Sequence, residues 1–196
     1  MKGSDSERRA QVLRAAERLL RHYGPGKTTI GDIAREAGIG VGSVYLEFGS
    51  KDEIIAELAR RRHDRVLSAM RHAAEAGSFS SRLAAALEAR VAALLDVSRD
   101  GAHGCDLVLC GAAGVKSAYG RFRAEELAFV AELLEAGARA GEFQITTAIE
   151  AAELLQLAFA RFSPPWLFEQ DRREVLRLVE GMTKLVLRGL LARTRR

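Results

Sequence analysis

The fold of this chain is decided by residues 29–54, which read TIGDIAREAGIGVGSVYLEFGSKDEI. Apolar residues recur at helical spacing on both sides of Gly38, and glycine favours the left-handed backbone that turns a chain between helices. Two short helices joined by such a turn are typical of a helix-turn-helix. We therefore expect a helix capped by Thr29, a turn at Gly38, and a second helix over about residues 41–48.

The residues around this stretch extend it to a small domain. A first helix is predicted over about residues 5–23, where Gly24-Pro25-Gly26 stops it. A capping box at residues 50–53 opens a long helix. A helix-turn-helix can place its second helix in the major groove of DNA. We therefore assign residues 1–50 to a three-helix DNA-binding domain and residues 51–196 to a second helical domain. The predicted small core of the first domain consists of Ile33, Ala34, Ile39, Val44 and Phe48.

The rest of the chain also reads as helix. Apolar spacing predicts helices over about residues 122–139, 147–163 and 172–193, and a short buried helix over 107–113. No alternating strand pattern persists along the sequence. The expected fold is all-α, with about nine helices in total.

The charge of the chain is concentrated near its N-terminus. Residues 1–72 hold 14 Lys/Arg and 10 Asp/Glu, whereas residues 73–196 hold 16 of each. The net charge of +4 therefore lies entirely in the first third, where it suits a polyanionic partner. A solvated basic surface is the alternative explanation of so small an excess.

Several classes of protein are disfavoured by the sequence. No apolar run reaches the length of a membrane span, and the first residues have no apolar segment typical of a signal peptide. Residues 111–114 lack the Gly-Lys-Ser/Thr ending of a phosphate loop, and neither a serine elbow nor a His-Glu-x-x-His motif occurs. We expect a cytoplasmic protein that is neither an enzyme nor a cofactor carrier.

His103, Cys105 and Cys110 suggest either a metal or thiol sensor or ordinary buried cysteines. Their spacing matches no known zinc motif, so we expect no metal site. Whether Cys105 and Cys110 sense anything stays open.

The central stretch resembles the TetR family of transcriptional regulators. The likeness is carried by residues 29–39, by Gly42-Ser43-Val44-Tyr45 and by residues 48–54, all at the family's spacing. Beyond residue 60 the similarity is only architectural. The resemblance implies a double-stranded DNA operator as partner.

The same resemblance assigns individual DNA-binding roles. Thr29 caps its helix and either brings the helix N-terminus to a phosphate or only caps. The Tyr45 phenol either meets a phosphate or belongs to the core, and Lys51 either meets a phosphate or is a surface charge. Ser43 reaches a base edge or a phosphate, and Gly42 leaves room for the groove. Lys27, Arg8 and Arg9 are expected to be generic phosphate contacts.

Leu46 and Glu47 depart from the family pattern, which often has an aromatic residue and a histidine there. Leu46 either touches a thymine methyl group or packs within the protein, and Glu47 either accepts a hydrogen bond from cytosine N4 or points to solvent. This departure leaves the operator sequence open.

The second domain is expected to dimerise and to bind a small molecule. The resemblance implies that the last two helices form a homodimer, which would read a palindromic operator. The middle helices would enclose an unknown, apolar effector that releases a repressor from DNA; an activator or an architectural DNA-binding protein is the alternative. The aromatic residues, either pocket or core, are Phe122, Phe129, Phe143, Phe159, Phe162, Trp166 and Phe168.

Overall fold

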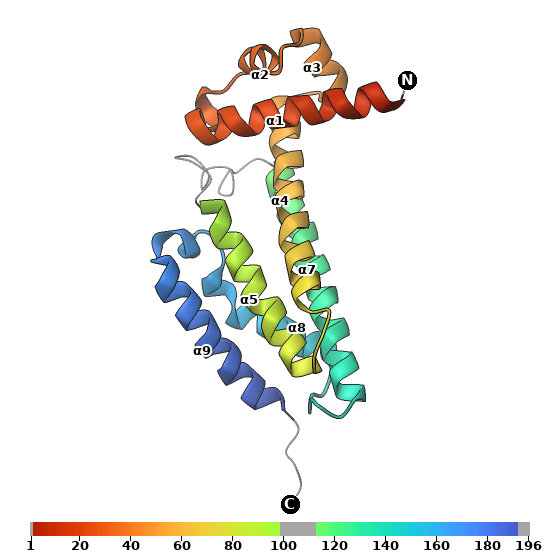
Figure 1. Cartoon of the computed structure of the whole chain (residues 1–196), viewed down its shortest axis with the longest axis vertical. Helices are drawn as coiled ribbons and strands as arrows, with labels where there is room; N and C mark the ends of the chain where they lie inside the picture. The colour runs from red at the N-terminus through yellow and green to blue at the C-terminus, as the bar shows by residue number, and fades with distance from the viewer. Residues whose placement is uncertain (1, 99–112, 192–196) are drawn as a thin grey trace, which may run out of the picture. The chain divides into compact units, whose positions relative to one another are not determined.

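The computed structural model of the chain describes residues 2–98 and 113–191. These residues are almost entirely helical, which confirms the all-α prediction (Figure 1). Their contacts divide the chain into two compact units. The first holds the described residues of Met1–His63 and Val97–Tyr119, and the second holds those of Asp64–Asp96 and Gly120–Arg196. The domain boundary proposed after residue 50 stays a prediction.

The first unit is built on α1 (Lys2–Lys27), α2 (Ile30–Ala37), α3 (Val41–Glu47) and the first part of α4 (Lys51–Ala73). Within α1 the backbone leaves the helical conformation at Gly24, where φ is 77°. Only glycine adopts this conformation without strain, so the helix breaks where the sequence predicts. Pro25 then begins one further helical turn, because its fixed φ suits the first position of a helix.

One apolar cluster holds the first unit together. The predicted core residues Ile33, Ala34, Val44 and Phe48 are buried in it, and Ile39 packs against it partly buried. Burial of each larger aliphatic side chain contributes about 1.5–3 kcal/mol. The other buried members are Val12, Leu13, Ala15, Ala16, Leu20, Ala37, Ile54, Ile55, Leu58, Ala59, Val115 and Ala118.

The helix predicted over residues 122–139 is present but begins earlier than predicted, and the short helix predicted over 107–113 lies almost entirely outside the described residues. A single helix, α7, runs from Ala113 to Arg139, and residues 107–112 lie outside the described part of the chain. A Cβ atom added at Gly114 would lie 2.6 Å from the Cβ of Ala56 in α4. Gly114 therefore serves the close packing of two helices, which outweighs the helix-breaking tendency of glycine.

The second unit comprises the rest of α4 and α7 together with α5 (Phe79–Ser98), α8 (Ala148–Ala158) and α9 (Arg172–Leu190). The helix predicted over 147–163 ends at Ala158 and gives way to the 3-10 turns Ala160–Phe162 and Trp166–Glu169. The helix predicted over 172–193 ends at Leu190, where the next residue is extended. None of the described helices has the length and apolarity that a membrane span requires.

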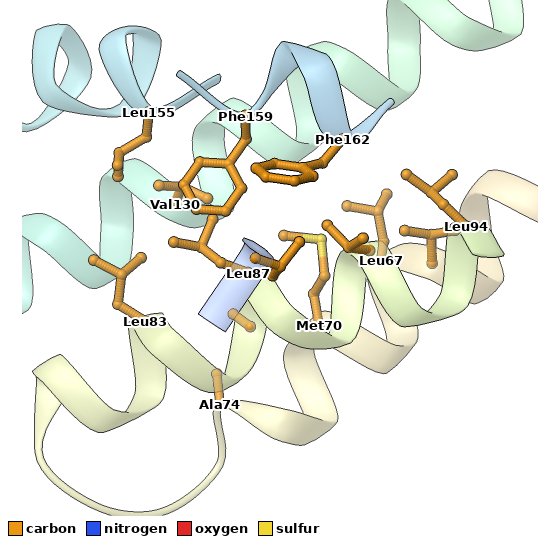
Figure 2. Packing of buried hydrophobic residues seen from close by; sticks show 14 of the residues in the cluster. Leu67, Met70, Ala74, Leu83, Leu87, Leu94, Val130, Leu155, Phe159 and Phe162 are labelled. Atoms are coloured by element: carbon orange, nitrogen blue, oxygen red, sulfur yellow. The ribbon is translucent and has the colours of Figure 1, made fainter. Parts of the chain in front are cut away.

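The core of the second unit brings together side chains from all of its helices. Figure 2 shows Leu67 and Met70 of α4, Leu87 of α5 and Val130 of α7 converging on Phe159. Among the aromatic residues considered above, Phe122, Phe143, Phe159 and Phe162 are buried in this core. Phe129 and Phe168 pack against it partly buried, and Trp166 is largely exposed.

A charged network lies buried inside the second unit. Arg90 of α5 donates its Nε–H to the Glu126 carboxylate of α7, and both side chains are almost fully buried. The same guanidinium donates to the Phe162 carbonyl at 3.2 Å and to the Ser163 hydroxyl at 2.9 Å. Gln156 of α8 donates to the second Glu126 oxygen at 3.2 Å. One arginine thus links α5 and α7 to the segment that follows α8.

We expect Glu126→Ala to lower the free energy of unfolding by about 3–5 kcal/mol, because it leaves the Arg90 charge buried without its carboxylate. The measurement is urea denaturation. The double variant Arg90→Met, Glu126→Leu removes both charges and should lose much less stability than Glu126→Ala. A single variant no less stable than the double one would contradict the assigned role.

A second carboxylate caps a helix in the same unit. The backbone N–H groups of Phe79 and Ser80, at the start of α5, each donate to Glu142 at 3.0 Å. These bonds, that of Ser80 foremost, hold the pKa of the Glu142 carboxyl below its ordinary value of 4.5. A lowered pKa means that the ionised group stabilises the fold above the unfolded-state value and that this stability is lost as the pH falls through the folded-state value.

We therefore expect Glu142→Gln to lower the free energy of unfolding at pH 7, and the difference from the parent protein to shrink as the pH falls below about 4.5. Denaturation at several pH values measures it. Glu132→Gln, at an exposed position on α7, is the control and should change stability little at any pH. A difference in unfolding free energy between Glu142→Gln and the parent that does not depend on pH would contradict a stabilising role of the Glu142 charge.

Candidate nucleic-acid interface

Thr29 and Asp32 form a reciprocal capping box at the start of α2. The Thr29 hydroxyl accepts from the Asp32 N–H at 3.2 Å and donates to the Asp32 carboxylate at 2.6 Å, while the Thr29 N–H donates to the same carboxylate at 3.0 Å. The hydrogen bond from the Thr29 hydroxyl is the main cause that lowers the pKa of the Asp32 carboxyl. The capping role of Thr29 is therefore confirmed.

The turn between α2 and α3 has the predicted glycine geometry. Gly38 has φ 67° and donates its N–H to carbonyls of the last turn of α2, and the Ile39 N–H donates to the Ala34 carbonyl at 3.0 Å. Ile39 packs against the core and fixes the turn. This turn sets the direction in which α3 leaves α2.

The helix α3 has one buried and one exposed face. Val44 is buried, as is Phe48 directly after the helix. Tyr45 is 54% exposed and Leu46 is 80% exposed, so neither packs in the core. A Cβ atom added at Gly42 would meet nothing within 4 Å, so the chain's own packing does not require glycine there.

Lys51, at the start of α4, fastens that helix to the link between α1 and α2. Its ammonium group donates to the carbonyl of Pro25 at 2.7 Å and to the carbonyl of Thr28 at 3.0 Å. Both carbonyls lie just before the capped start of α2. The alternative that Lys51 is only a surface charge is therefore wrong, because it has a structural role.

The other predicted residues lie at the borders of the exposed face of α3 or outside it. Ser43 is half-buried, and its N–H donates to the Gly40 carbonyl at 2.9 Å. Lys27 is exposed at the end of α1, two residues before Thr29. The structure thus gathers Lys27, Thr29 and Lys51 around the start of α2, whereas Gly42, Tyr45 and Leu46 lie on α3.

Glu47 is not directed to solvent, because only 11% of its side chain is exposed. Its carboxylate pairs with Arg8 of α1 at 3.5 Å, and its backbone carbonyl accepts from Arg9. The Arg9 guanidinium also lies over the Phe48 ring, 4.0 Å from its centre. These contacts join the end of α3 to the first turns of α1.

This role of Arg8 and Arg9 is not predictable from sequence spacing. They precede Glu47 by 39 and 38 residues, and no local periodicity links such distant positions. The one available signal is the departure from the family pattern at position 47, where Glu47 carries a charge opposite to that of Arg8. A further unpredicted link is the Gln11 side-chain amide, which donates to the Ala37 carbonyl at 2.6 Å.

The cysteine hypothesis is not tested by the structure. His103, Cys105 and Cys110 lie outside the described residues. In the part of the chain that is described, no group of three His, Cys, Asp or Glu side chains is placed to hold a metal ion.

Comparison with known proteins identifies the first unit. Residues 12–58 match the family described as bacterial regulatory proteins, tetR family. The regulator TtgR of Pseudomonas putida is 40% identical over 58 residues, which are 30% of this chain and 28% of TtgR. The repressor KstR2 of Mycobacterium tuberculosis is 41% identical over 58 residues, 30% of this chain and 29% of KstR2. The chain thus matches less than a third of the length of these relatives.

The solved structures extend the likeness to the fold of the whole chain. A putative TetR-family regulator from Mesorhizobium loti superposes with a TM-score of 0.72 at 19% identity and covers 96% of this chain and 98% of that one. The first unit thus matches the TetR family of transcriptional regulators over residues 12–58, and the fold of the chain is the one that the solved regulators share.

We expect Lys51→Met to lower the free energy of unfolding by about 1–3 kcal/mol, because two carbonyl groups lose a charged donor. Methionine keeps an apolar stem of similar length, so the packing changes little. Lys27→Met, at an exposed position, is the matched control and should change stability by no more than about 0.5 kcal/mol. Equal stabilities of the two variants would contradict the fastening role of Lys51.

Proposed function

We propose that this chain is a repressor that binds a palindromic double-stranded operator as a homodimer and is released by a small apolar effector in the cytoplasm. The proposal adds an operator, a dimer and an effector to the family likeness of the first unit. Among the relatives, KstR2 is named a transcriptional repressor. We retain the division into a DNA-binding domain of residues 1–50 and an effector and dimerisation domain of residues 51–196 as part of this proposal.

The observation that carries the proposal is the exposed face of α3. Gly42 has free space around its Cβ position, and Tyr45 and Leu46 are exposed beside it. A glycine that the fold does not need, on the second helix of a helix-turn-helix, is explained by close approach of the helix to the floor and walls of a major groove.

The phosphate contacts follow from the elements around α2. Thr29 caps α2 and leaves the other N–H groups of its first turn to attract a phosphate. Lys51 uses two of its three N–H donors on carbonyls, which leaves one donor for a phosphate. Lys27 adds charge beside them, and the Tyr45 phenol and the Ser43 hydroxyl supply donors from α3.

The dimer is proposed on the apolar side chains that α8 and α9 expose. Leu154 and Leu157 of α8 and Leu185 of α9 are each more than half exposed. Contact with the same helices of a second copy would cover these side chains and create a two-fold axis. Two copies of α3 would then read two half-sites of a palindromic operator.

The effector is proposed to act on the second unit. Its core consists mainly of aliphatic and aromatic side chains, so a ligand that entered between its helices would meet apolar surroundings. A ligand that binds one arrangement of the helices more tightly than another shifts the dimer toward the arrangement that it prefers. The resulting change in DNA affinity is limited by the difference between the ligand's affinities for the two arrangements.

The proposal is tested by selecting randomised duplex DNA with the full chain and measuring affinity for the selected sequence at several salt concentrations. We expect a palindromic sequence, and an affinity that falls as salt rises because phosphate contacts release counterions. Gly42→Ala should leave the protein folded, with a melting temperature no lower than that of the parent, and should weaken operator binding at least tenfold.

The matched control is Gly120→Ala, another exposed helical glycine with nothing within 4 Å of its Cβ position. It should bind the operator like the parent protein. Failure to select any sequence, or operator binding by Gly42→Ala at the parent affinity, would refute the proposed interface. Analytical ultracentrifugation of the same protein, with and without DNA, measures whether it is a dimer.

A further inference from the structure

The exposed face of α3 is dominated by apolar side chains. At 100° per residue, positions 41, 42, 45 and 46 fall within one arc of the helix, opposite the buried Val44. Leu46 is 80% exposed and Val41 is 46% exposed. Tyr45 supplies the one polar group within this arc.

The charged side chain of this helix is committed elsewhere. The side chain of Glu47 is 11% exposed and pairs with Arg8 of α1. Movement of its carboxylate toward a base would break this ion pair, which joins the end of α3 to α1. Glu47 is therefore a positioning residue for the ends of α1 and α3, and it is not available as an acceptor for cytosine N4.

An apolar side chain recognises one feature of the major groove. Among the four bases, only thymine presents a methyl group there, whereas the other groups are hydrogen-bond donors and acceptors. Contact between an aliphatic side chain and that methyl group removes apolar surface from water on both sides. A donor or acceptor facing Leu46 would lose its water without a replacement.

We propose that Leu46 is the residue that determines base specificity and that it reads the 5-methyl group of a thymine in each half-site. Its neighbour Gly42 allows the close approach that this contact needs. The inference rests on the proposed operator binding and names what the operator must contain: a T·A pair opposite Leu46.

The experiment uses the selected operator with single thymines replaced by deoxyuridine, which removes only the 5-methyl group. Affinity is measured for the parent protein and for Leu46→Ala on every duplex. At one or two positions of each half-site, the parent should lose about fourfold in affinity, as expected for one buried methyl group. Leu46→Ala should bind the parent operator less tightly and be insensitive to deoxyuridine at those same positions.

Two further variants separate this effect from a general loss of affinity. Lys27→Gln should weaken binding to all duplexes by the same factor and keep the sensitivity to deoxyuridine. Glu47→Gln should not change the preference for cytosine at any position, because its carboxylate faces Arg8. The melting temperature of Leu46→Ala should match that of the parent, since the side chain is exposed.

The outcomes distinguish this inference from the proposed function. If no duplex is selected, operator binding itself fails and the inference fails with it. If a duplex is bound but Leu46→Ala stays as sensitive to deoxyuridine as the parent, or no thymine matters, the thymine contact alone is refuted. A cytosine preference that disappears in Glu47→Gln would overturn the assignment of Glu47 as a positioning residue.

Discussion

The first unit depends on the contact between the Lys51 ammonium group and the carbonyls of Pro25 and Thr28. These carbonyls follow the break at Gly24 and precede the cap at Thr29, so they lie where α1 gives way to α2. The Lys51 ammonium group therefore donates hydrogen bonds to the segment between α1 and α2 and joins this segment to α4. The orientation of the helix-turn-helix follows from this junction.

Much of the first unit was predictable because its signals are local. The cap at Thr29, the left-handed turn at Gly38 and the buried positions of α2 and α3 each depend on residues within one turn of helix. The ion pair between Arg8 and Glu47 was not predictable, since it joins segments far apart in sequence. The start of α7 at Ala113 was not predicted for a related reason: the close contact of Gly114 with Ala56 also joins segments far apart in sequence.

The packed side and the exposed face of α3 contribute differently to the unit. Its buried side and the pair of Glu47 with Arg8 hold the helix in place, while Leu46 and Tyr45 are left without packing partners in the core. An ion pair that is mostly shielded from solvent fixes geometry more than it adds stability. Glu47, which departs from the family pattern, thus helps to hold α3 against α1. Leu46, which also departs from it, changes the exposed face of α3.

In the second unit, Arg90 makes contacts with α7 and with the segment after α8 that only one arrangement of these elements satisfies. A partial separation of α5 from α7 would leave two buried charges without partners, so intermediate positions of these helices are disfavoured. A domain built in this way changes shape in one step or not at all. In the proposed effector response, the buried arginine would act as a threshold: weak or poorly fitting molecules would leave the helices where they are, and the response would begin abruptly.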